Sequence, residues 1–321
     1  MYIETSLVTV IGAANMDING FSASPLNWAD SNPGRIEYCA GGVGRNIAEN
    51  LLRLGVRVKL IGALGDDPGG AMIAAHSREI GLDIEDSLFL SGAVSPVYLA
   101  LLDSGGELAV ALSDMGILEQ ITPDFIESRA GVIEKSGIVV VDANLSGETI
   151  GFISERFRGK RMFLDPVSAR KAEKVKPFDG RFHALKLGRM EAECLSGVAI
   201  PRGGGEAARD ALARAGAYFM ERGTGMVCIT LGGEGVYFQN GDEQFFAGVH
   251  QVRPVNTSGG GDAFMAGMVY AALHGFDSKK TVAFASAAAA ITVQSKTTVA
   301  GNMSADLVEQ TMELSGSRAG F

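Results

Sequence analysis

Three consecutive glycines precede a single aspartate in the stretch NTSGGGDAF, which runs from Asn256 to Phe264. An apolar run follows, and an amphipathic helix is expected to begin near Gly261. The first turn of a helix has unpaired N–H groups at the positive end of the macrodipole, so this stretch can form an anion-binding site. Glycine also lets the backbone approach an anion closely. Asp262 would lie beside that anion and could accept a proton, but the local pattern fits a helix cap equally well.

A second glycine-led helix start is GGVGRNIAENLLRLG, residues 41–55. Gly41 and Gly42 would let a polar ligand lie against the backbone, because neither carries a Cβ. The amide of Asn46 offers both a donor and an acceptor to hydroxyl groups. The alternative is a tight turn before a helix that packs in the core.

Asn15 and Asp17 follow the first apolar run of the chain, in the stretch GAANMDING. In an extended segment their spacing of two places both side chains on one face, which suits a pair of vicinal hydroxyls. A turn or a cap would use the same residue types.

Two further stretches place glycine or acidic residues after an apolar run. TLGGEGVYF turns through Gly232, Gly233 and Gly235, either as a simple hairpin or as a surface against a nucleotide. LKLGRMEAECLSG puts Glu191 and Glu193 early in a helix. An acidic first turn complements the helix dipole and needs no further role.

Several common site types are missing from the sequence. It contains no GxxxxGK[ST] loop, no GxGxxG after the first apolar run and no GxSxG elbow. The four histidines are scattered without metal-ligand spacing. These observations argue against a P-loop nucleotidase, a dinucleotide-binding enzyme, an α/β-hydrolase and a histidine-based zinc site.

Composition narrows the class of protein further. The 321 residues carry a formal net charge of −9, which argues against general nucleic-acid binding and against binding to an anionic membrane. Three widely separated cysteines predict no disulfide framework, and the N-terminus lacks the basic region of a signal peptide. We therefore expect a cytoplasmic protein. The alanine-rich stretch VAFASAAAAITV is too short to span a bilayer and predicts a buried helix.

The elements that must position these residues alternate along the chain. Helical patterns cover residues 44–55, 122–137 and 205–223. Continuous apolar strands that alternate with helices predict a largely parallel sheet covered on both faces. The expected strands are residues 7–12, 57–65, 137–143, 161–166, 183–187 and 226–233.

Two segments interrupt this alternation, at residues 14–38 and 95–114. The second reads as a hairpin with DSGGE as its turn. Both resemble strand-rich insertions, which could meet as a small lid over the ends of the parallel strands, where open α/β sheets bind their ligands. No linker or internal repeat divides the chain, so residues 1–321 are expected to form a single domain.

The order of these motifs, GGVGRNIAENLLRLG, GRMEAE, TLGGEGV and NTSGGGDAF, resembles that of the ribokinase, or PfkB-type, carbohydrate and nucleoside kinases over nearly the whole chain. Residues 18–51, together with LALLDSGGELAVALSDM and FLDPVSARK, are most similar to the pseudouridine-kinase subgroup. The resemblance implies a three-layer α/β/α ribokinase-like fold with a mostly parallel central sheet and a small β-sheet lid.

The same resemblance implies transfer of the γ-phosphoryl group of ATP to the 5′-hydroxyl of a ribose-bearing nucleoside. Asp262 would be the general base, and the anion hole would comprise Gly259, Gly260 and Gly261. The ribose hydroxyls would be held by Asn15, Asp17, Gly41, Gly42 and Asn46. The nucleotide site would include Gly232, Gly233, Gly235, Ser258, Ala287 and Asn302. Glu191 would act on Mg²⁺ through water, and Asn256 and Ser258 match part of a site for a monovalent cation such as K⁺.

Three positions depart from the family pattern. Gly188 stands where the family usually has the asparagine of an Asn-x-x-Glu pattern. In the glycine motif, Asn256 stands where the family usually has aspartate, and Gly260 stands where it usually has alanine. A sugar kinase of the ribokinase or fructokinase type, and a non-catalytic nucleoside or sugar sensor, therefore stay open as alternatives. Exposed lid strands invite pairing between copies, so a homodimer through the lid is expected.

Overall fold

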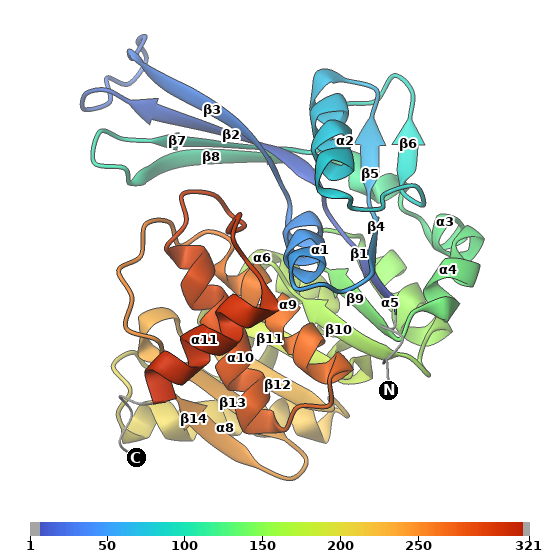
Figure 1. Cartoon of the computed structure of the whole chain (residues 1–321), viewed down its shortest axis with the longest axis vertical. Coiled ribbons are helices and arrows are strands. Elements are labelled where there is room, and N and C mark those ends of the chain that lie inside the picture. Colours follow the sequence, from blue (N-terminus) through green and yellow to red (C-terminus); the bar gives the residue numbers. More distant parts are fainter. Residues whose placement is uncertain (1–6, 317–321) are drawn as a thin grey trace.

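The computed structural model describes residues 7–316. Its largest sheet has eight strands in the order β14-β13-β12-β11-β10-β9-β1-β4 (Figure 1). Neighbours from β12 to β4 are parallel, whereas the β12–β13 and β13–β14 pairs are antiparallel. The strands are β1 (Val8–Ile11), β4 (Val58–Ile61), β9 (Ile138–Asp142), β10 (Arg161–Asp165), β11 (Ala184–Gly188), β12 (Met226–Thr230), β13 (Val236–Asn240) and β14 (Gln244–Ala247).

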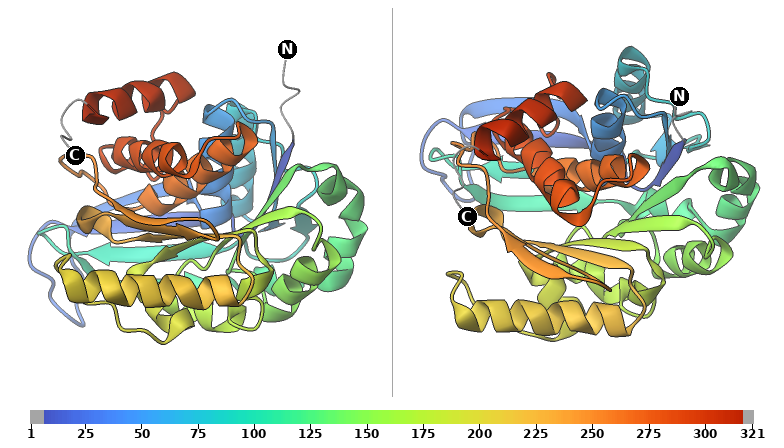
Figure 2. Two further views of the ribbon diagram at one scale, coloured as in Figure 1. Left: turned by 90° about the horizontal axis from the view of Figure 1, so that it is seen from below. Right: turned by 60° about the horizontal axis from the view of Figure 1, so that its bottom comes forward.

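Helices cover both faces of this sheet, which makes three layers (Figure 2). On one face lie α1 (Val43–Arg53), α2 (Pro68–Ile80), α9 (Gly260–Leu273), α10 (Ser278–Val293) and α11 (Ala305–Gly316). On the other lie α3 (Pro123–Ser128), α4 (Ala130–Lys135), α5 (Gly147–Arg156), α6 (Ala169–Ala172), α7 (Arg189–Ser196) and α8 (Glu206–Glu221). None of the helices within residues 7–316 is long and apolar enough to cross a membrane.

Strand β9 shows why the sequence forms three layers. All five of its residues are buried, and alternate residues of a strand point to opposite faces. Ile138 and Val140 accordingly join the core beneath α1, α9 and α10. Val139 and Val141 join the second core beneath α5, α7 and α8. A continuous apolar run of this kind is stable only when both faces of its sheet are covered.

Side chains at the helix starts explain several of the observed boundaries. Asp67, Thr122, Ser146 and Asp277 each accept a hydrogen bond from a backbone N–H within the first turn that follows. These caps satisfy N–H groups that have no partner inside the helix. At the other end of α2, Gly81 adopts the left-handed conformation that commonly stops a helix.

A smaller sheet projects from the carboxyl edge of the central one, because β2 begins only four residues after β1 ends. Its strand order is β3-β2-β7-β8, and Figure 1 shows it as a separate layer. Its strands are β2 (Asn15–Ser22), β3 (Gly34–Gly41), β7 (Val97–Leu102) and β8 (Leu108–Asp114). The two segments that interrupt the alternation therefore pair with each other, along the parallel contact between β2 and β7.

The two faces of the small sheet differ in polarity. Cross-strand neighbours lie on the same face of a sheet. One row joins Tyr38, Ile18, Leu99 and Leu112, and most of this row is exposed. The next residues along the strands, such as Asp17, point to the opposite face. The small sheet thus presents an exposed apolar face and a second face that carries Asp17.

The predicted fold class is confirmed, with three differences in detail. The helix expected over residues 122–137 is two short helices that meet at Arg129. The strand expected over residues 57–65 is interrupted at Gly62, after which β5 (Ala63–Gly65) leaves the central sheet and pairs with β6 (Leu88–Leu90). The first insertion extends beyond its expected end, because β3 continues to Gly41.

Candidate active site

Three charged side chains lie at the carboxyl edge of the central sheet, where sequence reasoning had not singled them out. Asp142 ends β9, Asp165 ends β10, and Lys186 lies within β11. Lys186 Nζ and Asp165 Oδ2 form an ion pair at 2.8 Å, with side chains that are 9% and 1% exposed. The signal was available in GIVVVDA, RMFLDP and HALKL, because a charge inside or directly after a buried strand requires a partner or a function.

Lys186 points at the start of α9. A Cβ built on Gly261 would lie 2.9 Å from Lys186 Nζ, so the ammonium lies against the backbone of the glycine run. Burial opposes the charge, but the nearby Asp165 and Glu191 carboxylates outweigh it and raise the pKa of Lys186. The side chain therefore stays cationic at neutral pH and adds a positive charge to the N-terminus of the helix.

Asp262 lies in the first turn of α9 and is 8% exposed. Its Oδ2 accepts a hydrogen bond of 2.8 Å from Nδ2 of Asn46 on α1. Burial, reinforced by the negative charge of Asp165, raises the pKa of the Asp262 carboxyl to about 7, against the opposing effects of Lys186 and Asn46. A carboxyl group that titrates near neutral pH is suited to accept a proton at that pH.

The glycines before Asp262 are required by close packing. Gly259 has φ +79° and is the N-cap of α9, and a Cβ on it would lie 1.9 Å from the carbonyl oxygen of Thr298. A Cβ on Gly260 would lie 2.9 Å from a methyl of Val293. Because Gly259 occupies the cap position, the alternative in which Asp262 caps the helix is not what the structure contains.

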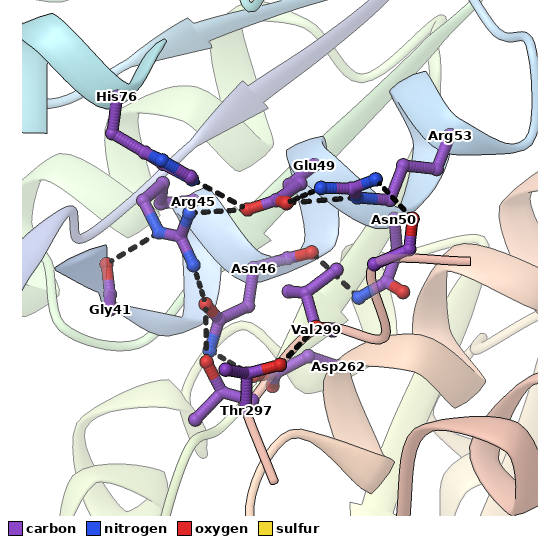
Figure 3. A network of polar contacts seen from close by, with 12 residues as sticks. Gly41, Arg45, Asn46, Glu49, Asn50, Arg53, His76, Asp262, Thr297 and Val299 are labelled. Carbon is purple, nitrogen blue, oxygen red and sulfur yellow. Dashed lines mark hydrogen bonds and ion pairs between the residues drawn. The ribbon is translucent and has the colours of Figure 1, made fainter. Parts of the chain in front are cut away.

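The carboxylate of Asp262 belongs to a network of polar contacts on α1 (Figure 3). Asn46 Oδ1 accepts from Arg45 Nη2 at 2.5 Å, while its Nδ2 faces Asp262. Arg45 in turn contacts Glu49, and Glu49 contacts Arg53. The expected helix of residues 44–55 therefore packs in the core and also carries polar groups toward α9.

Asn15, Asp17, Gly41 and Gly42 come together where the small sheet joins α1. Asn15 pairs with Gly41 in register, and Asn15 Nδ2 donates to Asp17 Oδ1 at 2.6 Å. The Asp17 carboxylate lies over Gly41, where a Cβ would be 2.2 Å from Oδ2. Gly42 has φ +98° and passes close to Ala13 O. Burial raises the pKa of Asp17.

The residues expected at the nucleotide differ in how exposed they are. Gly232 and Gly233 form an exposed turn between β12 and β13, and Asn302 is exposed in the connection before α11. Gly235 is buried against Phe246, within the hairpin that was the simpler reading of this motif. The structure does not bring Ala287 to this surface, because its side chain is 0% exposed within the core.

Asn256 and Ser258 shape the loop before α9. Asn256 Oδ1 accepts from Ser258 N at 2.9 Å, and its Nδ2 donates to Lys296 O at 3.1 Å. The amide thus ties the loop to the connection after α10, and both of its ends are engaged. Within residues 7–316, no group of three or more His, Cys, Asp or Glu side chains could hold a metal ion.

Glu191 caps the helix that follows Gly188. Its carboxylate accepts a hydrogen bond from Gly188 N, which satisfies an N–H group at the start of α7. Burial raises the pKa of Glu191, although Lys186 opposes that effect. Glu193 has a different partner, because its Oε1 accepts a hydrogen bond from Ile200 N at 2.7 Å. Glu191 therefore has a structural role beside the charged edge of the sheet.

A glycine-led helix start, a buried carboxylate and a buried lysine meet at the carboxyl edge of the central sheet, and phosphoryl transfer chiefly requires such alignment and charge neutralisation. The family model of the pfkB family carbohydrate kinases matches residues 5–305, and the chain belongs to that family. It is similar to the pseudouridine kinase of Escherichia coli K12, with 36% identity over 88% of each chain. It is also 34% identical to the uncharacterized sugar kinase YeiI of the same organism, over 94% of this chain and 82% of that one.

Solved structures agree with this assignment. A putative sugar kinase from Clostridium perfringens superposes with a TM-score of 0.84 at 34% identity, covering 97% of this chain and 96% of that one. Arabidopsis thaliana ribokinase, solved with ribose and ATP, superposes with a TM-score of 0.80 at 20% identity, covering 96% and 99%. The second likeness concerns the fold alone. The protein is a nucleoside or sugar kinase with a ribokinase-like fold.

Proposed function

We propose that this protein transfers the γ-phosphoryl group of ATP to the 5′-hydroxyl of pseudouridine. The observation that carries the proposal is the Asp262 carboxylate, which is buried at the N-terminus of α9 directly after three glycines and beside Lys186. The pseudouridine kinase among its relatives supports the choice of substrate.

Asp262 acts as the general base. The 5′-oxygen attacks the γ-phosphorus, its proton passes to the Asp262 carboxylate, and the bond from the γ-phosphorus to the bridging oxygen breaks to release ADP. A pKa of about 7 leaves much of the carboxylate ionised at neutral pH while keeping it basic enough to take the proton.

The negative charge of the transferred phosphoryl group is neutralised from two sides. The backbone N–H groups that follow Gly259 point out of the first turn of α9 and receive the phosphoryl oxygens, together with the macrodipole. The ammonium of Lys186, beside Gly261, adds a full positive charge to the same place. Phosphoryl transfer depends mainly on alignment and charge neutralisation, which this arrangement supplies.

Asn15, Asp17 and Asn46, with the backbone at Gly41 and Gly42, hold the ribose. Their clustering at the junction of the small sheet with α1 supports this assignment. The polar face of the small sheet closes over the sugar as a lid, while its apolar face points away. The amide of Asn15 and the carboxylate of Asp17, at the start of β2, can bind two neighbouring hydroxyls.

ATP lies along the turn that contains Gly232 and Gly233, with Asn302 nearby. Mg²⁺ prefers oxygen ligands and usually arrives with the phosphates, retaining several waters. The carboxylates at this edge suit that preference, but Glu191 is engaged by Gly188 N and Asp165 by Lys186. This fits an ion held mainly by ATP and reached by Glu191 through water. A monovalent cation beside Asn256 and Ser258 would bind through backbone oxygens, because the Asn256 amide is engaged.

A substrate panel tests the proposal. The purified protein is incubated with Mg-ATP and pseudouridine, uridine, guanosine, ribose or fructose, and ADP release is measured. Pseudouridine should have the highest kcat/KM. A higher value for ribose or fructose would favour a sugar kinase, the candidate supported by the likeness to YeiI. Calorimetric binding of pseudouridine without any ADP release would favour a sensor and contradict the kinase.

We infer also that two copies associate through the apolar face of the small sheet. Tyr38, Leu99 and Leu112 lie in one row on that face and are exposed in the single chain. A contiguous apolar patch on a soluble protein commonly marks an interface, and a second copy presents the same patch.

A further inference from the structure

Arg45 is a buried arginine next to the proposed substrate site. It lies in the first turn of α1, and its residue is 2% exposed. Its guanidinium has three partners, which Figure 3 shows: Gly41 O at 3.1 Å, Glu49 Oε2 at 2.5 Å and Asn46 Oδ1 at 2.5 Å. A fork of five donors can reach three acceptors at once in a fixed geometry.

The contact with Arg45 decides which way the Asn46 amide faces. Arginine has donors only, so the amide atom that meets it must be the oxygen. The hydroxyl of Thr298 donates to the same oxygen at 3.4 Å, and a hydroxyl is compatible with either orientation of the amide, so the choice rests on Arg45. The amide nitrogen is then left to face Asp262, to which it donates at 2.8 Å. With the amide reversed, its oxygen would face the carboxylate oxygen and repel it.

Arg45 is itself held in place by Glu49. The two oxygens of the Glu49 carboxylate are shared between two arginines, because Oε2 meets Arg45 and Oε1 meets Arg53 at 2.7 Å. His76 Nε2 lies 3.3 Å from Oε2. Burial opposes the charge of Glu49, but the arginines outweigh it and lower its pKa, so it remains an anion. The guanidinium of Arg45 therefore has one stable position.

We propose that Arg45 is a positioning residue: it fixes the Asn46 amide so that the amide nitrogen holds the Asp262 carboxylate in its reactive position. The inference rests on the proposed function, since it assumes that Asp262 is the general base. It adds a residue that has no contact with Asp262 and acts through Asn46 alone. Arg45 and Arg53 both bind Glu49, but of these two arginines only Arg45 contacts Asn46.

The groups that act on Asp262 come from four elements. Asp142, Asp165 and Lys186 face it from the central sheet, and Asn46 faces it from α1. The two aspartates favour the protonated form, whereas Lys186 and Asn46 favour the anion. Loss of the Asn46 hydrogen bond should therefore make Asp262 titrate at a higher pH. A hydrogen bond to a charged group corresponds to a shift of about one pH unit.

The experiment follows the titration of Asp262 by NMR of ¹³C-carboxyl-labelled aspartate, with Asp262→Asn used for assignment. Arg45→Met should raise the midpoint by about one pH unit. The matched variant Arg53→Met removes one positive charge from the same Glu49 and should leave the midpoint unchanged. In parallel, the acid limb of kcat should move upward with Arg45→Met while the KM for ATP stays the same.

A double-mutant cycle tests the route through Asn46. Asn46→Ala should raise the midpoint as much as Arg45→Met, and the double variant should rise no further. Equal shifts from Arg45→Met and Arg53→Met, or shifts that simply add in the double variant, would overturn the proposal. If Arg45→Met does not fold, Arg45→Gln replaces it, because an amide that can donate or accept no longer fixes the orientation of Asn46, and an unchanged midpoint in that variant would equally contradict the proposal. If the wild-type protein transfers no phosphoryl group, the proposed function fails, and the NMR titration still decides the role of Arg45.

Discussion

The amide nitrogen of Asn46 donates a 2.8 Å hydrogen bond to the carboxylate of Asp262, although the two residues are 216 positions apart. This contact joins the first glycine-led helix of the chain to the last one. It places a residue expected at the sugar next to the residue expected to take the proton. The predictions below depend on this junction and on the burial around it.

Replacing Asp262 by asparagine should lower kcat by about 10²- to 10⁴-fold, the range expected for loss of a general base. The KM for the nucleoside should change much less, because the amide keeps the shape of the side chain. Steady-state kinetics at saturating Mg-ATP measures both values. Near-normal turnover would remove Asp262 from the role of base.

The pH profile of kcat/KM for the nucleoside should have an acid limb with a midpoint at about pH 7, the pKa to which burial raises Asp262 in the free enzyme. Below that pH the carboxyl is protonated and cannot accept the 5′-hydroxyl proton, so kcat/KM should fall about tenfold per pH unit. The profile is measured from pH 5 to 9 with the nucleoside varied below its KM. A flat profile between pH 5 and 7 would contradict the assignment.

Stability should respond to pH through the same group. Asp262 ionises near pH 4 in the unfolded chain and near pH 7 in the folded one, so the folded state holds its proton more tightly. The contribution of Asp262 to wild-type stability should therefore fall as pH rises from about 4 to 7. Asp262→Asn lacks this loss and should gain stability relative to wild type, by up to a few kcal/mol at pH 8. Urea unfolding at pH 5 and 8 measures the difference, with exposed Asp210→Asn as control.

Gly259→Ala should disrupt the start of α9. Its φ of +79° is unfavourable for alanine, and the new methyl would lie 1.9 Å from Thr298 O. Gly275→Ala is the matched control, because Gly275 has φ +66° and open space around it. The control should lose about 1–2 kcal/mol, the cost of the left-handed conformation alone. Gly259→Ala should lose more and should also lose phosphoryl transfer, as thermal unfolding and the ADP assay would show.

Leu112→Glu should convert a dimer into a monomer if the apolar face of the small sheet is the interface. A carboxylate buried within an apolar interface would be desolvated without a partner. Light scattering after size exclusion gives the mass of the wild type and the variant. Phe89→Glu places the same charge at an exposed apolar residue on β6 and should leave the mass unchanged. A wild type that is already monomeric would contradict the dimer.

The strands and helices of the three-layer fold could be predicted well from the sequence, because the patterns that indicate them lie within short segments. Runs such as IVVVD are apolar at every position, and that pattern requires a sheet covered on both faces. The break of the helix at Arg129 and the departure of β5 at Gly62 were missed, since both depend on what packs against them. Ala287 was misplaced because an alanine in a helix carries no sign of which side it faces.

Sequence patterns alone were enough to predict the family, the alternation of strands and helices, and the glycine-led start of α9 with Asp262 in its first turn. These follow from glycine spacing and hydrophobic period, which are properties of short segments. The buried pair of Lys186 and Asp165 beside Gly261, and the Asn46 amide that joins Arg45 to Asp262, became visible only in the folded chain. Such contacts join distant segments, and the burial that raises the pKa of Asp262 arises only when those segments pack together.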